Sequence, residues 1–225
     1  MSWGLPMLFT TENDAEEINI ILRPYRPEEA LNISDGISSH LVSQYMSLNT
    51  AQTPEDAAEW LHKMSKSDTD MLWAVCIGKD ANDRVGSTIG STGLHKIHEG
   101  RASSGFVIYD TSMWGKGIAS ACHRARCFYA HHILGLKAID SEVAYANIGS
   151  YKALLSVGYT EVGTRYSGHF ANGKWHHLHQ LTWVNPHKLA WNRFWDTNEP
   201  TSEFIEARAR ARKALRWAET NITFL

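Results

Sequence analysis

The sequence predicts a mixed α/β fold in which a meander of strands feeds one helical crossover. The chain has 225 residues, 43% hydrophobic and 20% charged, which is enough to bury the core of one substantial domain. Short apolar runs typical of strands alternate with stretches whose apolar residues recur every three or four positions, as in helices. The resulting order is strand, two helices, three strands, helix, strand, helix and two strands.

Each element rests on a local signal. The first strand, residues 18–27, is closed by two prolines, Pro24 and Pro27. The helix at 53–66 begins with Thr53 as N-cap and Pro54 in its first turn. The helix at 147–158 ends at Gly158, a residue suited to a C-cap. The other expected strands are 71–78, 86–98, 102–110, 137–145, 159–170 and 175–185, and the other expected helices are 27–46, a helix from 117 and a charged helix at 202–219.

We expect three parts along the chain: a polar leader at 1–17, the main domain at 18–186, and an aromatic linker with a C-terminal helical extension at 187–225. In the last helix Arg208, Arg212 and Arg216 share one face. That face is interpreted as solvated, with a homodimer contact or docking of RNA or an acidic protein as alternatives.

Composition makes several classes of protein improbable. The net charge of -2 and pI of about 6.6 do not favour nucleic acid or an anionic membrane as partner. The apolar runs fall short of the roughly 18 residues of a spanning helix, and the N-terminus lacks the pattern of a signal peptide. Three cysteines without a C-x-x-C pair favour a reducing, cytoplasmic location.

A glycine-rich bend lies between the strand at 102–110 and the following helix. Gly115 and Gly117 flank Lys116 in the sequence W-G-K-G-I-A. Such a bend exposes successive backbone N–H groups at the positive end of a helix dipole, which suits a phosphate or pyrophosphate. The spacing matches neither the Walker loop nor the dinucleotide fingerprint. Taken by itself, the bend could equally be a turn that only connects the strand to the helix and binds no ligand.

A second sequence pattern also favours a ligand site. Asn147 follows a strand, Ser150 comes three residues later, and the pair Gly158–Tyr159 follows. Together with W-G-K-G-I-A, this resembles the GNAT superfamily of N-acetyltransferases over residues 18–184. The hairpin sequence G-T-R-Y-S-G-H-F-A-N-G-K-W is similar to that of the subgroup that acetylates protein N-termini, including those of ribosomal proteins. In that subgroup Trp commonly takes the first position of the phosphate loop, as Trp114 does here.

The resemblance implies a mostly antiparallel central sheet, splayed in its middle and flanked by helices, with acetyl-CoA as acetyl donor. It places the pyrophosphate on the backbone of the glycine loop and helix start, and the pantetheine arm along the preceding strand end. Asn147 would hydrogen-bond that arm, although it could simply cap the next helix. The cofactor-binding residues so implied are Ile108, Tyr109, Trp114, Gly115, Lys116, Gly117, Ile118, Ala119, Ser120 and Asn147.

The chain departs from the family at two catalytic positions. Ser103 stands where many members have a glutamate base, and Leu154 where many have a tyrosine acid. Candidate substitutes for the base are Glu142, His169 and His177. Ser150 would lie near the thiol. Alternatively, no dedicated base is needed, because an α-amine has an unperturbed pKa near 8 and is partly neutral already.

The histidine pairs raise the question of a metal. On a strand, His177 and His179 share a face, but no acidic or cysteine partner stands at ligand spacing, so we expect no metal. The sequence therefore predicts an acetyl-CoA-dependent N-acetyltransferase acting on a primary amine, with a protein or peptide N-terminus as the expected acceptor. A small-molecule amine is the alternative acceptor. Because of Ser103 and Leu154, a non-catalytic acyl-CoA-binding module is the alternative from another class.

Overall fold

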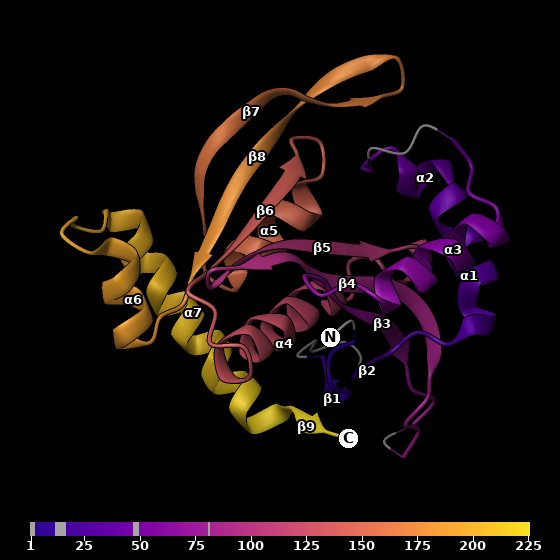
Figure 1. Cartoon of the computed structure of the whole chain (residues 1–225), viewed down its shortest axis with the longest axis horizontal. Coiled ribbons are helices and arrows are strands. Elements are labelled where there is room, and N and C mark those ends of the chain that lie inside the picture. The colour runs from indigo at the N-terminus through magenta and orange to yellow at the C-terminus, as the bar shows by residue number, and fades with distance from the viewer. Residues whose placement is uncertain (1–2, 12–16, 47–49, 81) are drawn as a thin grey trace.

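The computed structural model describes residues 3–11, 17–46, 50–80 and 82–225. Within these residues one sheet of nine strands runs through the molecule in the order β7-β8-β6-β5-β4-β3-β2-β1-β9 (Figure 1). Neighbouring strands are antiparallel except β5 and β6, which are parallel. The strands are β1 (Met7–Thr10), β2 (Asn19–Arg23), β3 (Met71–Ile77), β4 (Ser87–His98), β5 (Arg101–Ile108), β6 (Ala138–Ala144), β7 (Tyr159–Ala171), β8 (Lys174–Val184) and β9 (Thr223–Phe224).

Helices cover both faces of the sheet. Alternation along β3 defines the two layers: Trp73 and Val75 belong to the core under α4 and α7, whereas Leu72 and Ala74 belong to the core under α1 and α3. Below, the face of α1 and α3 is called the front face. The helices are α1 (Ala30–Ser38), α2 (His40–Ser43), α3 (Pro54–Ser65), α4 (Ile118–His132), α5 (Ile148–Ser156), α6 (Lys188–Trp195) and α7 (Ser202–Asn221), with short 3-10 turns η1 (Pro27–Glu29) and η2 (Thr111–Met113).

The mixed, mostly antiparallel fold predicted from the sequence is confirmed, including its local signals. Thr53 and Asp56 form a reciprocal capping box at the start of α3. Gly158 has φ +98°, and its N–H donates to the carbonyl of Leu155 at the end of α5. The helical stretch expected at 27–46 is divided into η1, α1 and α2, with Ser39 extended between the two helices.

The two ends of the chain contribute more to the sheet than their sequences indicate. Residues Met7–Thr10, within the expected leader, form β1, which pairs with β2 on one side and with β9 on the other. The remainder of the leader includes residues 1–2 and 12–16, which lie outside the described part. The expected linker after Pro186 contains helix α6, and α7 buries Ala207, Ala211 and Ala218 in the core.

The sheet opens between β5 and β6. Only three residue pairs join these strands, Arg101–Ala138, Ala102–Ile139 and Ser103–Asp140, after which they diverge (Figure 1). The part of β5 beyond Ser103 therefore has one edge without a strand partner. This opening is the splay expected from the resemblance.

A buried arginine supports β5 at the opening. Arg126 of α4 is fully buried, and its Nη1 donates to the carbonyl of Gly105 (2.9 Å) and to Thr92 Oγ1 (3.0 Å). Its Nη2 contacts Nδ1 of His123 at 2.9 Å. Burial lowers the pKa of His123 well below its usual value, so this imidazole is neutral and accepts the hydrogen bond from the arginine.

No helix of the described segments has both the length and the apolar composition that crossing a membrane requires. The three cysteines, Cys76, Cys122 and Cys127, are free thiols in the interior. Burial raises the pKa of Cys76 to about 11 and that of Cys127 to about 12, so both thiols remain protonated and inert.

Candidate active site

The free edge of β5 presents the backbone of Ile108. The N–H of Tyr109 donates to the carbonyl of Ile89 in β4 (2.9 Å). Since successive residues of a strand point their backbone groups to opposite edges, the N–H and C=O of Ile108 face the opening. The indole Nε1 of Trp114 donates to the carbonyl of Ile108 at 2.9 Å. Of the two strand-end residues expected to pair with an extended ligand, Ile108 thus offers its backbone and Tyr109 does not.

The glycine bend leads directly into α4. Gly115 and Gly117 have φ values of +77° and +78°, which favour glycine, and a Cβ at either position would meet nothing within 4 Å. The helix begins at Ile118, and the N–H groups of its first turn, including those of Ala119 and Ser120, have no acceptor within the helix. The bend and helix start therefore form an open concavity of backbone donors at the positive end of the helix dipole.

Asn147 caps the next helix, as one of the two sequence interpretations expected. Its Oδ1 accepts a hydrogen bond from the N–H of Ser150 at 3.1 Å. This use of Oδ1 leaves Nδ2 as the side-chain donor of Asn147, so capping and donation to a ligand are compatible. Ser150 is half-buried in the first turn of α5.

The remaining predicted catalytic residues do not form one cluster. Glu142 of β6 pairs with Arg165 (2.9 Å) and accepts from Gln180 on the front face. His177 of β8 points to the opposite face, because it lies an odd number of residues from Gln180, the register partner of Glu142. There its Nδ1 accepts from the N–H of Ser167. The structure therefore separates Glu142 from His177 by the thickness of the sheet.

His169 has a structural contact near the end of the hairpin. It is 4% exposed, and its Nε2 donates to the backbone carbonyl of Gln44, directly after α2. This contact ties the β7–β8 hairpin to the segment that follows α1. His179, on the other face, contacts Glu161 at 2.9 Å and stacks between Tyr145 and Tyr151.

Leu154 and Ser103, the two positions that depart from the family, lie in different parts of the structure. Leu154 is 1% exposed in the core, and the nearby Tyr151 donates its hydroxyl to Glu161. Ser103 lies on the front face of β5 between its register partners His95 on β4 and Asp140 on β6. Among the described residues no group of three or more His, Cys, Asp or Glu side chains is arranged to hold a metal ion.

Sequence reasoning missed His95 and Asp70. His95 Nδ1 lies 2.9 Å from Asp70 Oδ1, and the two residues stand on the front face at the start of the splay. Asp70 also accepts from Ser67 Oγ at 2.6 Å. Burial would raise the pKa of Asp70, but the hydrogen bonds from Ser67 and His95 outweigh it and lower that pKa. One feature of the sequence could have indicated His95: in the run Gly93-Leu94-His95 of a predicted strand, the glycine and the histidine share a face.

An inner cavity of about 280 Å³ lies on the front face between the sheet and helices α1 and α3. Tyr25 and Tyr109 share a hydrogen bond at 2.9 Å, and burial raises the pKa of both, so their hydroxyls are neutral. Of its described lining residues none is acidic, and His95 is the single titratable group besides the tyrosines. The lining comprises Tyr25, Ile33, Ile37, Met46, Gln52, Ala57, Trp60, Leu72, Ser91, Gly93, His95, Gly105, Phe106, Val107 and Tyr109.

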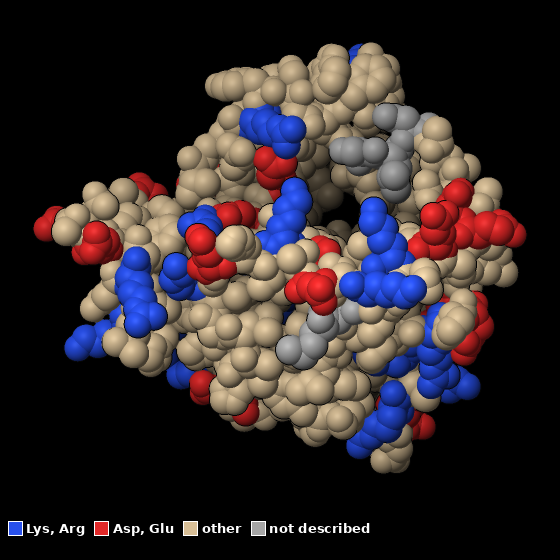
Figure 2. Space-filling view, in the orientation of Figure 1, with Lys and Arg blue, Asp and Glu red and all other residues tan. Residues whose placement is uncertain are grey.

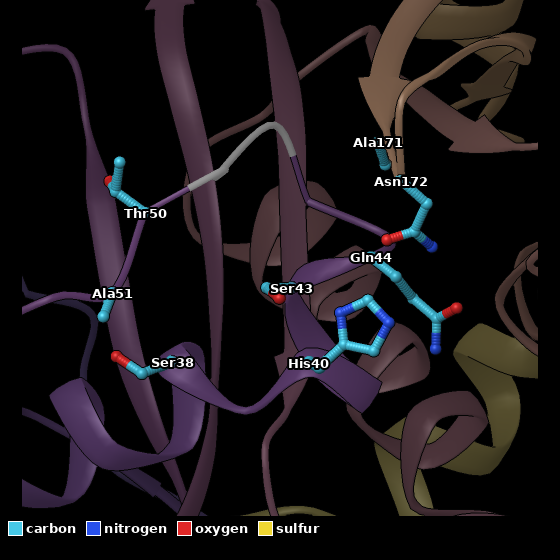
Figure 3. A pocket seen from close by; sticks show the side chains of 8 residues that line it. All are labelled: Ser38, His40, Ser43, Gln44, Thr50, Ala51, Ala171 and Asn172. Carbon is cyan, nitrogen blue, oxygen red and sulfur yellow. The ribbon is translucent and has the colours of Figure 1, made fainter.

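An outer pocket of about 300 Å³ lies between α1–α2 and the tip of the β7–β8 hairpin (Figure 3). His40, Gln44 and Asn172 lie close together on one side of it, and Thr50 and Ala51 lie on the opposite side. The lining is mainly polar: Ser38, His40, Ser43, Gln44, Thr50, Ala51, Ala171 and Asn172. Inner and outer pockets border the same segments, because Ile37 lines the former and its neighbour Ser38 the latter. Figure 2 shows a hollow beneath the hairpin, with basic and acidic side chains around it.

The family of the chain follows from its sequence and agrees with this geometry. Residues 19–160 match the family described as "Acetyltransferase (GNAT) domain". The chain therefore belongs to the GNAT acetyltransferases, enzymes that use acetyl-CoA as acetyl donor. No protein with a curated function has a matching sequence.

Solved structures show the same fold. RimJ of Mycobacterium smegmatis, in complex with CoA-disulfide, superposes with a TM-score of 0.68 at 14% identity, covering 97% of each chain. A spermidine N-acetyltransferase from Vibrio cholerae, in complex with CoA and spermine, gives a TM-score of 0.66 at 18% identity, covering 73% of this chain and 95% of that one. An acetyltransferase of the GNAT family from Bacillus anthracis gives 0.62 at 17% identity, with 79% and 98% coverage.

Proposed function

We propose that this enzyme acetylates the α-amine of a protein or peptide whose first residue is apolar. The observation that carries the proposal is the inner cavity, which is lined by apolar and aromatic side chains and borders the free edge of β5. The RimJ-like fold over the whole chain and the hairpin sequence of the N-terminal acetyltransferase subgroup support the same acceptor class.

We assign acetyl-CoA to the opening between β5 and β6. The concavity of the glycine bend and the free N–H groups of Ile118, Ala119 and Ser120 suit its pyrophosphate. The backbone of Ile108 and the Nδ2 of Asn147 suit the amides of its pantetheine arm. Bound there, the cofactor supplies an activated thioester, and the unpaired N–H groups of β5 are placed to stabilise the oxyanion that develops on the acyl oxygen.

The inner cavity discriminates between classes of amine. A polyamine carries further ammonium groups, and holding these in a buried site requires acidic partners. The described lining offers no carboxylate, whereas Ile33, Trp60 and Val107 offer apolar surface. An amine attached to an apolar side chain therefore fits this cavity better than a polyamine.

The outer pocket gives the rest of a peptide a place to bind. A peptide backbone has one donor and one acceptor for almost every residue. His40, Gln44 and Asn172 supply polar atoms for such groups close to the inner cavity (Figure 3). A short polyamine would leave these atoms without partners.

An acceptor panel tests this function. It contains peptides that differ only in the first residue (Met, Leu or Asp), a peptide with a blocked N-terminus and an internal lysine, and spermidine. We expect the kcat/KM for the Met and Leu peptides to exceed that for spermidine by at least tenfold, measured as thiol release with product mass. The blocked peptide serves as control and should be inactive. A preference for spermidine would overturn the proposed acceptor.

The cofactor assignment predicts the effect of Gly117→Trp. A side chain added at the open concavity would occupy the space assigned to the pyrophosphate, so acetyl-CoA should bind at least tenfold more weakly, a loss of about 1.4 kcal/mol. Gly135→Trp is the matched control, because Gly135 also has a positive φ (+61°) and open space but follows the other end of α4. Equal affinities of both variants in calorimetry would contradict the assignment.

A further inference from the structure

We infer that His95 is the general base of the acetyl transfer and that Asp70 is its positioning residue. The inference rests on the proposed function for its acceptor and goes beyond it in naming the group that accepts the proton. None of the base candidates predicted from the sequence takes this place: Glu142 is held by Arg165, His169 is buried against the carbonyl of Gln44, and His177 is on the opposite face.

The tautomer of His95 follows from its partner. Because the pKa of Asp70 is lowered, its carboxylate is ionised and can only accept, so Nδ1 of His95 carries the hydrogen of their 2.9 Å contact. In the neutral imidazole the lone pair then lies on Nε2. Ser67 holds the carboxylate from the other side, through its hydroxyl to Oδ2 and by accepting from the N–H of Asp70.

Two glycines let the imidazole lie against the sheet. Gly93 and Gly105 are register partners on β4 and β5. They lie two residues from His95 and Ser103, which form the next pair on the same face of the sheet. A Cβ built on Gly93 would come within 2.9 Å of His95 Nε2, and one on Gly105 within 2.8 Å. Any other residue at either position would therefore displace the ring. Nε2 thus occupies the space above the first residues of β5 that lack a β6 partner.

This location brings the lone pair on Nε2 of His95 close to the sites that we assign to the amine acceptor and to acetyl-CoA. His95, Gly105 and Phe106 all line the inner cavity, which we assign to the acceptor. The side chains of His95 and Asp70 are 30% and 19% exposed, so the pair is accessible from the cavity yet partly shielded from water. In the transfer, the acceptor nitrogen forms a bond to the acyl carbon while its proton passes to Nε2. The C–S bond breaks, the thiolate of CoA leaves, and the proton that Nε2 has accepted passes to it, which returns His95 to its neutral form.

The kinetic test compares His95→Gln with His98→Gln. His98 is a matched control, because it lies on the same strand with its side chain 72% exposed. With whichever amine the acceptor panel finds to be turned over, His95→Gln should lower kcat by about 10²–10⁴-fold, while acetyl-CoA affinity in calorimetry stays within twofold. His98→Gln should keep the wild-type kcat. A kcat for His95→Gln within tenfold of wild type would overturn the inference.

Two further measurements separate chemistry from folding. In His95→Ala, added imidazole should restore part of the lost rate, a rescue that a merely structural role would not give. In the wild-type protein, long-range 1H–15N NMR at pH 8.5 should show His95 protonated at Nδ1. In Asp70→Asn, the same measurement should show the proton shifted toward Nε2, and kcat should be lower than in the wild type. If wild-type His95 were protonated at Nε2, the inference would be overturned, whatever the acceptor panel gives. If no amine in the panel were turned over, that result would contradict the proposed acceptor and not the role of His95.

Discussion

Replacing Gly158 with valine is expected to lower the free energy of unfolding by about 2 to 6 kcal/mol, the sum of backbone strain and overpacking. Gly158 has φ +98°, where a β-branched residue is strained. A Cβ there would meet the backbone of α7, at 2.6 Å from Ala211 N and 2.7 Å from Ala207 O. Backbone atoms of a packed helix cannot move aside as a flexible side chain can, so α7 would have to leave its position. Urea unfolding followed by tryptophan fluorescence measures the loss.

Gly135→Val separates the two contributions. Gly135 also has a positive φ, but a Cβ at this position would meet no atom within 4 Å, so this variant carries the strain without the clash. We expect it to lose only about 1 to 3 kcal/mol. Equal losses in the two variants would show that α7 does not press on Gly158.

Glu29→Gln is expected to cost about 3 to 5 kcal/mol, as for other buried ion pairs from which one partner is removed. Glu29 accepts two hydrogen bonds from Arg23, at 2.7 and 2.9 Å, and a third from the hydroxyl of Thr88. The N–H of Arg26 donates to it as well. This network joins β2, η1 and β4, and its loss would leave the guanidinium of Arg23 buried without an anion.

The cost of Glu29→Gln should depend on pH. Burial would raise the pKa of Glu29, but the hydrogen bonds from Arg23, Thr88 and Arg26 outweigh it and lower the pKa below its ordinary value of 4.5. The carboxylate therefore stabilises the fold above pH 4.5, and this contribution is lost as the pH falls through the folded-state pKa. The wild type should lose its advantage over the variant in acid.

Glu206→Gln is the control for this substitution. Glu206 is 75% exposed and lies 3.8 Å from Arg210 on α7, so its pairing contributes little. We expect its unfolding curve to overlay that of the wild type between pH 4 and 8. If Glu29→Gln were as stable as Glu206→Gln at pH 7, the buried network would not stabilise the fold.

The sequence was informative wherever a structural feature depends on neighbouring residues alone. The start of α3 at Thr53, the end of α5 at Gly158 and the bend at Gly115 and Gly117 follow from capping chemistry and from the conformational freedom of glycine. The order of strands and helices follows from hydrophobic periodicity. These features together also carried the resemblance to the family, which the match of residues 19–160 confirmed.

Contacts across the sheet were beyond such reasoning, because register and packing decide them. Met7 pairs with Phe224, and neither short segment has enough residues to show an alternating pattern. The sequence could not indicate that Glu142 and His177 face opposite sides, since the offset between β6 and β8 is fixed only when the strands pair.

By itself, then, the sequence determined the fold class, the family and the glycine bend, since each depends on residues close together in the chain. Tertiary structure alone decided which side chains meet on the front face. His95 and Asp70 are brought together because β3 and β4 pair, and the imidazole can lie over β5 because Gly93 and Gly105 become partners in the sheet. No local pattern encodes that meeting; it follows from the register in which β3, β4 and β5 pair.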